Sequence, residues 1–133
     1  MKISPADTIA AVATPPGEGA LAVIRISGPQ SLQIGDRIFR GRRPLSTAPG
    51  YTLHHGTIVN QAGQDVDEVL AAVFRAPRSY TGEDALEISC HGGLFVTNGV
   101  LNAALSAGAR RADPGARPRA RRLSRPPAGQ PSA

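Results

Sequence analysis

The last eighteen residues of the chain limit what it can fold into more than any other feature. Ala, Arg, Pro and Gly fill 14 of the 18 positions in residues 116–133, and Leu123 is the single large aliphatic residue there. Such a segment cannot bury enough apolar surface to offset its chain entropy, so we predict that it is disordered. A folded domain must therefore be completed within residues 1–115, a length that allows one hydrophobic core.

The positive charge of the chain lies in its C-terminal part. The net charge is +5, but residues 1–109 contain eight basic and nine acidic residues, a net charge of −1. Residues 110–133 contain seven Arg and one acidic residue, Asp113, a net charge of +6. One hypothesis is therefore a basic protein that binds nucleic acid non-specifically through its Arg-rich tail, with a strong dependence on salt.

Several classes of protein do not fit the sequence. The longest apolar run, Val69–Phe74, is too short to cross a bilayer, and residues 1–5 lack the apolar segment of a signal peptide. With one Cys and three His, neither a disulfide framework nor a zinc site is expected. We therefore expect a soluble, cytoplasmic protein with no membrane partner and no bound metal.

The phosphate-binding loop of nucleoside triphosphatases is absent from the sequence. Gly17-Glu18-Gly19 is rich in glycine, but no Gly-Lys-Ser or Gly-Lys-Thr follows, and Lys2 is the only lysine in the chain. Such a loop needs a lysine to contact the phosphates of the nucleotide. We therefore expect this chain to be a binding module without catalysis of its own.

The hydrophobic pattern predicts an α+β domain, with a mixed sheet and two or more helices. Apolar runs and polar–apolar alternation predict strands over residues 7–14, 20–27, 52–59, 67–75 and 85–91. Helical spacing predicts one helix over residues 30–39 and a second that ends at Gly108. Residues 40–50 are predicted to form a loop, and turns are predicted at residues 15–19 and 60–64, the second of which closes a hairpin.

Two charged side chains in predicted strands are the candidate binding residues. Arg25 lies within an apolar strand, where a guanidinium is costly to bury unless something pairs with it. Glu87, flanked by Leu86 and Ile88, is its natural partner. The pair could be structural, or each residue could lie on a solvated strand face. Alternatively, both groups bind one polar molecule, because a carboxylate can accept paired hydrogen bonds from an amino-pyrimidinone edge as it does from Arg.

Other candidates rest on weaker patterns. Alternation over residues 85–91 places Cys90 on the apolar strand face and Glu87 and His91 on the other face. Cys90 is therefore expected to be a small core residue. A single His at a strand end is more often structural than catalytic. Residues 81–84 have the Thr-x-x-Asp spacing of a helix cap within a polar loop.

Two long motifs resemble a known family. Residues 7–28 contain DTIAA, ATPPGEGA and VIRISG, and residues 76–93 contain APRSYTGED, EI and CHGG. In their order and spacing these motifs resemble the start of the tRNA-modifying GTPase family MnmE, also called TrmE. Residues 106–110 and 112–115 continue the resemblance, which covers about residues 3–115.

The resemblance implies a domain that binds a tetrahydrofolate derivative and mediates homodimer formation. Its fold is expected to be similar to folate-binding domains of the glycine-cleavage aminomethyltransferase type. In the family, the residues that match Arg25 and Glu87 contact the folate, which favours the ligand pocket over the structural ion pair. The folate is expected in its 5-formyl or 5,10-methylene form.

The resemblance also implies partners for the full-length family. There, a GTPase that uses GTP, Mg²⁺ and K⁺ works with an MnmG-type flavoprotein to modify the wobble uridine of certain tRNAs. The folate supplies a one-carbon unit, and GTP hydrolysis drives the conformational cycle. GTP, Mg²⁺ and K⁺ are not expected to bind to this chain, which lacks the sequences of the helical and GTPase domains.

The sequence departs from the family after residue 115. The family continues with a stretch similar to GEFTxRAFLNGKLDL, whose lysine also contacts the folate, whereas this chain continues with the Arg-rich tail. We therefore predict a folate-binding and dimerisation domain over residues 1–115 and a disordered tail over residues 116–133. Ala, Arg, Pro and Gly have codons that begin with two G or C bases. Our hypothesis is that a frameshift near residue 115 produced the tail, which the other two reading frames of the gene would test.

Overall fold

A computed structural model of the chain describes residues 7–14, 21–79 and 82–112. The predicted turn at residues 15–19, the start of the Thr-x-x-Asp pattern and the predicted disordered tail lie outside the described residues. The strands are β1 (Ile9–Val12), β2 (Leu21–Ser27), β3 (Phe39–Gly41), β4 (Thr52–Val59), β5 (Asp65–Phe74), β6 (Ala85–His91) and β7 (Arg110–Arg111). The helices are α1 (Ser31–Ile38), the short 3₁₀ helix η1 (Leu45–Thr47) and α2 (Leu94–Ser106).

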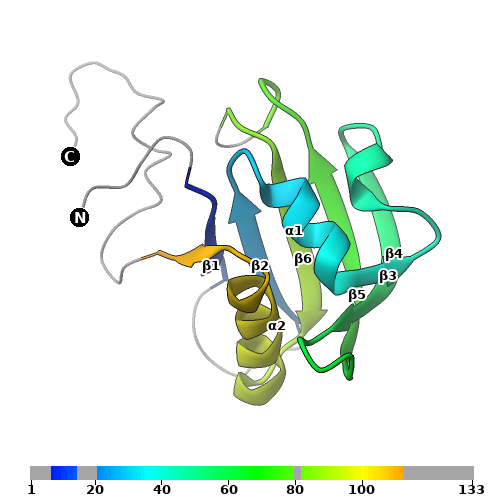
Figure 1. Cartoon of the computed structure of the whole chain (residues 1–133), viewed down its shortest axis with the longest axis vertical. Helices are drawn as coiled ribbons and strands as arrows, with labels where there is room; N and C mark the ends of the chain where they lie inside the picture. The colour runs from blue at the N-terminus through cyan, green and yellow to red at the C-terminus, as the bar shows by residue number, and fades with distance from the viewer. Residues whose placement is uncertain (1–6, 15–20, 80–81, 113–133) are drawn as a thin grey trace.

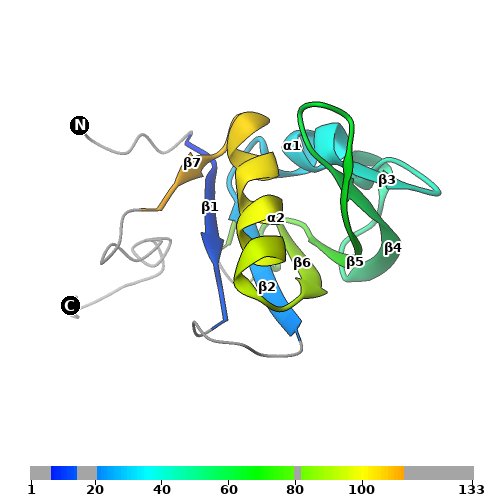
Figure 2. The same cartoon turned by 90° about the horizontal axis from the view of Figure 1, so that it is seen from below.

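The described strands form one mixed sheet in the order β3-β4-β5-β6-β2-β1-β7 (Figure 1). Neighbouring strands are antiparallel except β1 and β7, which are parallel. Helices α1 and α2 cover the same face of the sheet, as Figure 2 shows from a second direction. None of the helices in the described part of the chain is long and apolar enough to span a membrane. The predicted α+β domain with a mixed sheet and two helices is therefore confirmed.

The hydrophobic core lies between the two helices and the sheet. Alternate residues of each central strand point toward the helices, because successive side chains of a strand point to opposite faces. The fully buried members of β2 and β6 are Ile24, Ile26, Leu86 and Ile88, and Cys90 is 1% exposed. The predicted alternation in residues 85–91 is confirmed, since Glu87 and His91 are the more exposed residues of that strand.

Three short elements differ from the predictions. The predicted loop over residues 40–50 is wrong in part, because β3 extends to Gly41 and η1 lies within it. Strand β7 was not predicted either. All three are two or three residues long, too short to show a hydrophobic period. Strands β3 and β7 form because β4 and β1 offer backbone partners at the two edges of the sheet.

One side chain from α1 and one from the residue that follows β5 fix the segment that contains η1. The Asp36 carboxylate accepts hydrogen bonds from the backbone N–H of Ser46, at 3.1 Å, and from the Ser46 hydroxyl. The Arg75 guanidinium donates to the backbone carbonyl oxygens of Ser46 and Ala48, each at 2.7 Å. These bonds satisfy carbonyl groups that no strand or helix would otherwise pair, so the segment is ordered without regular structure.

Gly35 allows α1 to approach β6 closely. Glycine inside a helix costs about 1 kcal/mol relative to alanine, so its presence there has to be explained by packing. A Cβ atom at this position would overlap Leu86 Cδ1 and lie 3.0 Å from Leu45 Cδ1. Leu45 and Leu86 are fully buried, and a close-packed interior leaves them little room to move aside.

We predict that Gly35→Ala lowers the free energy of unfolding by about 1–3 kcal/mol, because overpacking outweighs the gain of about 1 kcal/mol in helix propensity. Urea denaturation followed by circular dichroism measures this difference. Gln33→Ala is the matched control, since Gln33 is exposed on the same helix and its replacement should leave stability nearly unchanged. A Gly35→Ala protein as stable as the wild type would contradict the packing argument.

Candidate functional site

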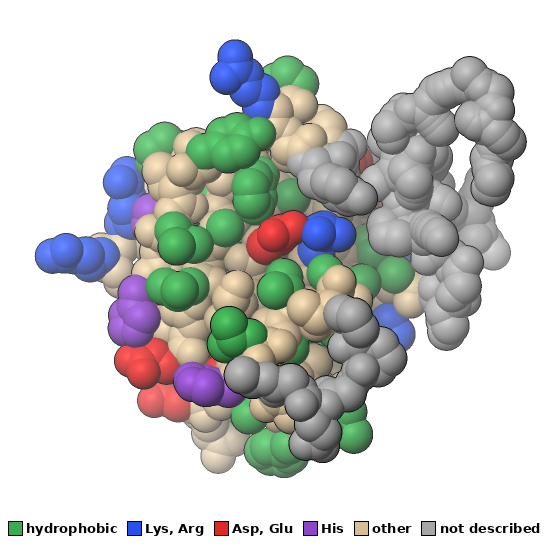
Figure 3. Space-filling model, turned by 180° about the vertical axis from the view of Figure 1, so that it is seen from behind, with side chains coloured by type: hydrophobic (Ala, Val, Ile, Leu, Met, Phe, Trp, Pro, Cys, Tyr) green, Lys and Arg blue, Asp and Glu red, His purple; other side chains and the backbone are tan. Residues whose placement is uncertain are grey.

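The face of the sheet opposite the helices, here called the open face, carries the predicted site residues. Arg25 in β2 and Glu87 in β6 occupy paired positions in the register of the two strands. Apolar side chains surround them on the same face, and those that are largely exposed are Leu21, Tyr51 and Leu53, at 63, 66 and 62%. Figure 3 shows this view, in which an acidic and a basic side chain lie together among hydrophobic ones. The open face thus combines an apolar surface with one polar pair.

Arg25 and Glu87 form an ion pair. Both Nε and Nη2 of Arg25 donate to the same oxygen of Glu87, Oε2, at 2.9 and 2.7 Å. The two side chains are 27 and 28% exposed, so each is mostly shielded from water. A half-buried guanidinium stays charged at low cost only with such a partner, as the sequence predicted. The predicted proximity of the two residues is therefore observed.

The geometry of the pair leaves part of Glu87 accessible to a ligand. Both hydrogen bonds described between Arg25 and Glu87 end on Oε2, and no described residue donates a hydrogen bond to Oε1. A carboxylate has about four acceptor positions, and a guanidinium has five N–H donors in a fixed plane. Together they can recognise a planar group that presents donors on one side and a carbonyl oxygen on the other.

A short polar cluster lies beside the ion pair, at the end of β2. Ser27 is two residues beyond Arg25 on the same strand face, and its hydroxyl donates to Glu83 Oε1 at 3.0 Å. The Asp84 carboxylate accepts a hydrogen bond from the backbone N–H of Ala76 at 2.9 Å. The Asp84 side chain thus ties two ends of a loop together, whereas Thr81, the other end of the cap-like pattern, lies outside the described residues. The sequence analysis did not single out Glu83.

His91 lies at the other end of the open face. Its Nδ1 is 2.9 Å from Asp67 Oδ1, and its backbone N–H donates to Asp67 Oδ2 at 2.8 Å. The imidazole is 68% exposed, and it is four residues along β6 from Glu87, a distance of about 13 Å along an extended strand. The structure therefore gives His91 a carboxylate partner from β5 that local sequence could not predict, and it does not bring His91 to the ion pair.

Cys90 is a core residue, as predicted. It is 1% exposed and points toward the helices rather than into the open face. Burial, together with the nearby negative charge of Asp67, raises the pKa of its thiol to about 11. The thiol is therefore protonated at neutral pH and is a poor nucleophile.

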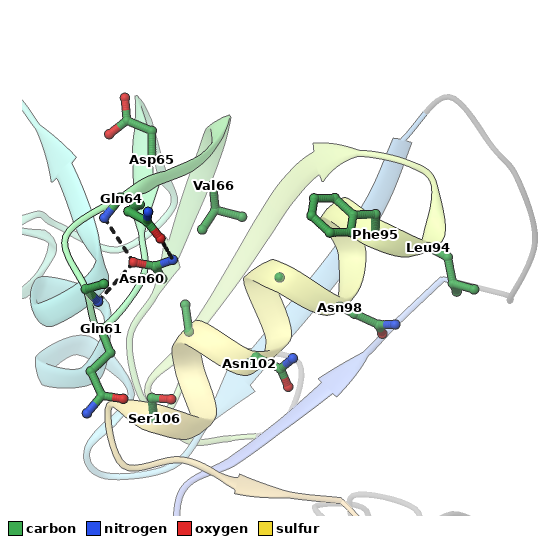
Figure 4. Close-up of a pocket in the computed structure, with 13 residues that line it drawn as sticks. Asn60, Gln61, Gln64, Asp65, Val66, Leu94, Phe95, Asn98, Asn102 and Ser106 are labelled. Atoms are coloured by element: carbon green, nitrogen blue, oxygen red, sulfur yellow. Dashed lines mark hydrogen bonds between the residues drawn. The ribbon is translucent and has the colours of Figure 1, made fainter.

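A separate groove of about 950 Å³ lies on the helix side of the molecule, between α2 and the turn that joins β4 to β5 (Figure 4). Phe95, which is 91% exposed, stands at its α2 side. Asn60 is at its turn side, where its side-chain oxygen accepts backbone hydrogen bonds from within the same turn. Among the described residues of its lining, Asp65 is the only charged one. The groove contains neither Arg25 nor Glu87, so it is distinct from the predicted site.

The fold and the open face define a small α+β domain with a polar candidate site on the helix-free side of its sheet. The sequence profile described as GTP-binding protein TrmE N-terminus matches residues 8–119 of the chain. The chain therefore belongs to the TrmE N-terminal domain family, and the resemblance that the motifs indicated is confirmed. The predicted domain boundary at residue 115 stays a prediction.

Curated relatives agree with this assignment. The chain is 52% identical over 111 residues to the tRNA modification GTPase MnmE of Protochlamydia amoebophila, which covers 84% of this chain and 24% of that protein. It is 49% identical over 112 residues to the protein of the same name from Bacillus subtilis, with 82 and 24% covered. The chain thus spans about a quarter of the length of the curated relatives that it matches.

Proposed function

We propose that this domain binds a tetrahydrofolate derivative, in the 5-formyl or 5,10-methylene form, at Arg25 and Glu87. One observation carries the proposal: a mostly shielded ion pair lies within an apolar sheet face, with Glu87 Oε1 still able to accept hydrogen bonds. The amino-pyrimidinone edge of a pterin presents paired N–H donors of the kind that a carboxylate accepts. The neighbouring carbonyl oxygen of the same ring is an acceptor for the Arg25 guanidinium.

We also propose that the open face is where two copies of the domain meet as a homodimer. Leu21, Leu53 and Leu70 are 63, 62 and 42% exposed on this face. Exposed apolar side chains gathered on one face are typical of an interaction site. If two copies meet around a two-fold axis through this face, the same patch of each copy is buried. The ion pairs and any bound pterin are then also shielded from water.

The proposed setting is the cytoplasmic modification of the wobble uridine in tRNA. The relatives are named as tRNA modification GTPases, and this chain corresponds to their N-terminal quarter. In that setting the domain supplies the folate site, while GTP, Mg²⁺ and K⁺ bind to the GTPase domain of the complete protein. An MnmG-type flavoprotein and tRNA are the partners of the complete protein. We propose that the chain by itself binds the folate and does not catalyse a reaction.

We predict saturable binding of 5-formyltetrahydrofolate to the wild-type chain in isothermal titration calorimetry. Arg25→Ala and Glu87→Ala should each weaken the affinity about ten- to a hundredfold, because a hydrogen bond to a charged group is worth about 1.5–3 kcal/mol. Glu68→Gln is a matched control. Glu68 is exposed, with its Oε2 3.1 Å from His55 Nε2, and the substitution should leave the affinity unchanged. Absence of saturable binding, or equal binding by all four proteins, would count against the assigned site.

The dimer proposal predicts a dimer in sedimentation velocity at micromolar concentration. Leu53→Asp should raise the dissociation constant at least about tenfold, since it places a charge in a buried apolar contact. Phe95→Asp is the matched control, because Phe95 is even more exposed but lies on α2, on the helix side. If Phe95→Asp dissociates the dimer and Leu53→Asp does not, the open face is not the interface.

The alternative function, non-specific nucleic-acid binding through the tail, rests on the seven Arg in residues 110–133. It predicts that a chain ending at residue 115 loses RNA binding in an electrophoretic mobility assay but keeps any folate binding. Binding by the whole chain should also fall steeply between about 50 and 200 mM salt, as expected for contacts to phosphates. RNA binding that survives the deletion would assign it to the folded domain instead.

A further inference from the structure

A second carboxylate, that of Glu83, lies beside Ser27, at the end of β2. Ser27 holds it, through a hydrogen bond of 3.0 Å from the Ser27 hydroxyl to Glu83 Oε1. Ser27 and Arg25 are alternate residues of β2, so their side chains share a face and their Cα atoms are about 7 Å apart. A fused two-ring heterocycle bound at Arg25 and Glu87 and directed along β2 would extend toward Ser27, and so toward Glu83.

The backbone around Glu83 fixes this carboxylate in place. The Ser79 hydroxyl donates to the carbonyl oxygen of Glu83, and the carbonyl oxygen of the next residue, Asp84, accepts from the Gly28 N–H at 3.0 Å. Ser27 itself is only 8% exposed. Glu83 is thus held by the end of the sheet, and its carboxylate is preorganised for a ligand rather than positioned by chance on a surface.

The chemistry of a carboxylate suggests what Glu83 does. An ionised carboxylate can only accept hydrogen bonds. Reduction of a pterin adds N–H donors to the pyrazine half of the ring system, and the 5-formyl and 5,10-methylene derivatives keep one of them. The oxidised ring has lone pairs at those nitrogens, which a carboxylate repels. A polar group aimed at a ligand N–H rejects the analogue that lacks the hydrogen, and it does so far more strongly than an apolar contact could.

We propose that Glu83, held by Ser27, is the residue that selects reduced over oxidised pterins at the Arg25–Glu87 site. This inference rests on the proposed folate-binding function and adds a redox specificity to it. Glu87 recognises the amino-pyrimidinone edge, which reduced and oxidised pterins share. Glu83 recognises the hydrogens by which the two forms differ. Glu87 thus contributes to the binding of both forms, and Glu83 discriminates between them.

The test compares tetrahydrofolate and folic acid in anaerobic isothermal titration calorimetry. The wild-type chain is expected to bind tetrahydrofolate at least about tenfold more tightly than folic acid. Glu83→Gln should weaken tetrahydrofolate binding about ten- to a hundredfold, the range expected for one hydrogen bond to a charged group. It should leave folic acid binding unchanged or stronger, because an amide N–H can donate to a ring lone pair. Ser27→Ala, which removes the hydrogen bond from Ser27 to Glu83, should reduce the preference by a smaller factor.

Controls separate the possible outcomes. Glu68→Gln removes a carboxylate from the same face and should not change the preference. Circular dichroism establishes that each variant is folded before it is titrated. If Glu83→Gln lowered the affinity for both ligands equally, this inference would be overturned and Glu83 would have a structural role. A wild-type chain that binds both ligands equally well would also overturn it but keep the proposed function, whereas a wild-type chain that binds neither ligand would overturn both.

Discussion

The pairing of β2 with β6 determines both faces of this domain. Its register aligns Ile24 with Ile88 on the helix side and Arg25 with Glu87 on the open face. A shift of one residue in β2 would bury Arg25 among the helices and expose Ile24 and Ile26. The hydrophobic core therefore fixes the position of the ion pair, since the same register that fills the core is the one that brings the two charges together.

The ion pair is arranged so that a ligand can add to it without separating it. In a low-polarity setting, breaking a guanidinium–carboxylate contact leaves each charge without compensation, which costs more than the contact contributes. Here both described hydrogen bonds from Arg25 to Glu87 end on one carboxylate oxygen, and no described residue donates to the other. A ligand that donates to that oxygen keeps the pair intact, so binding does not have to offset its loss.

The elements with a repeating hydrophobic pattern could be predicted from the sequence. The parts of the structure that depend on contacts between distant residues could not. Alternation in residues 85–91 was enough to assign the faces of β6, and an arginine within an apolar strand was enough to predict a carboxylate partner. Strands β3 and β7 have two or three residues and no period of their own. The partners of His91 and Ser27, Asp67 and Glu83, are 24 and 56 residues away in the chain, and local sequence contains no signal for either contact.

The parallel strand β7 joins the far end of the domain to its beginning. The Arg110 N–H donates to the Thr8 carbonyl oxygen at 2.8 Å, and the Ala112 N–H donates to the Ala10 carbonyl oxygen at 3.2 Å. On the ribosome, β1 is synthesised first but its outer edge has no partner until the residues after α2 have emerged. An unpaired strand edge invites pairing with other chains. The outer edge of β1 therefore stays unpaired while most of the domain is translated. That edge is the segment that a chaperone would have to protect.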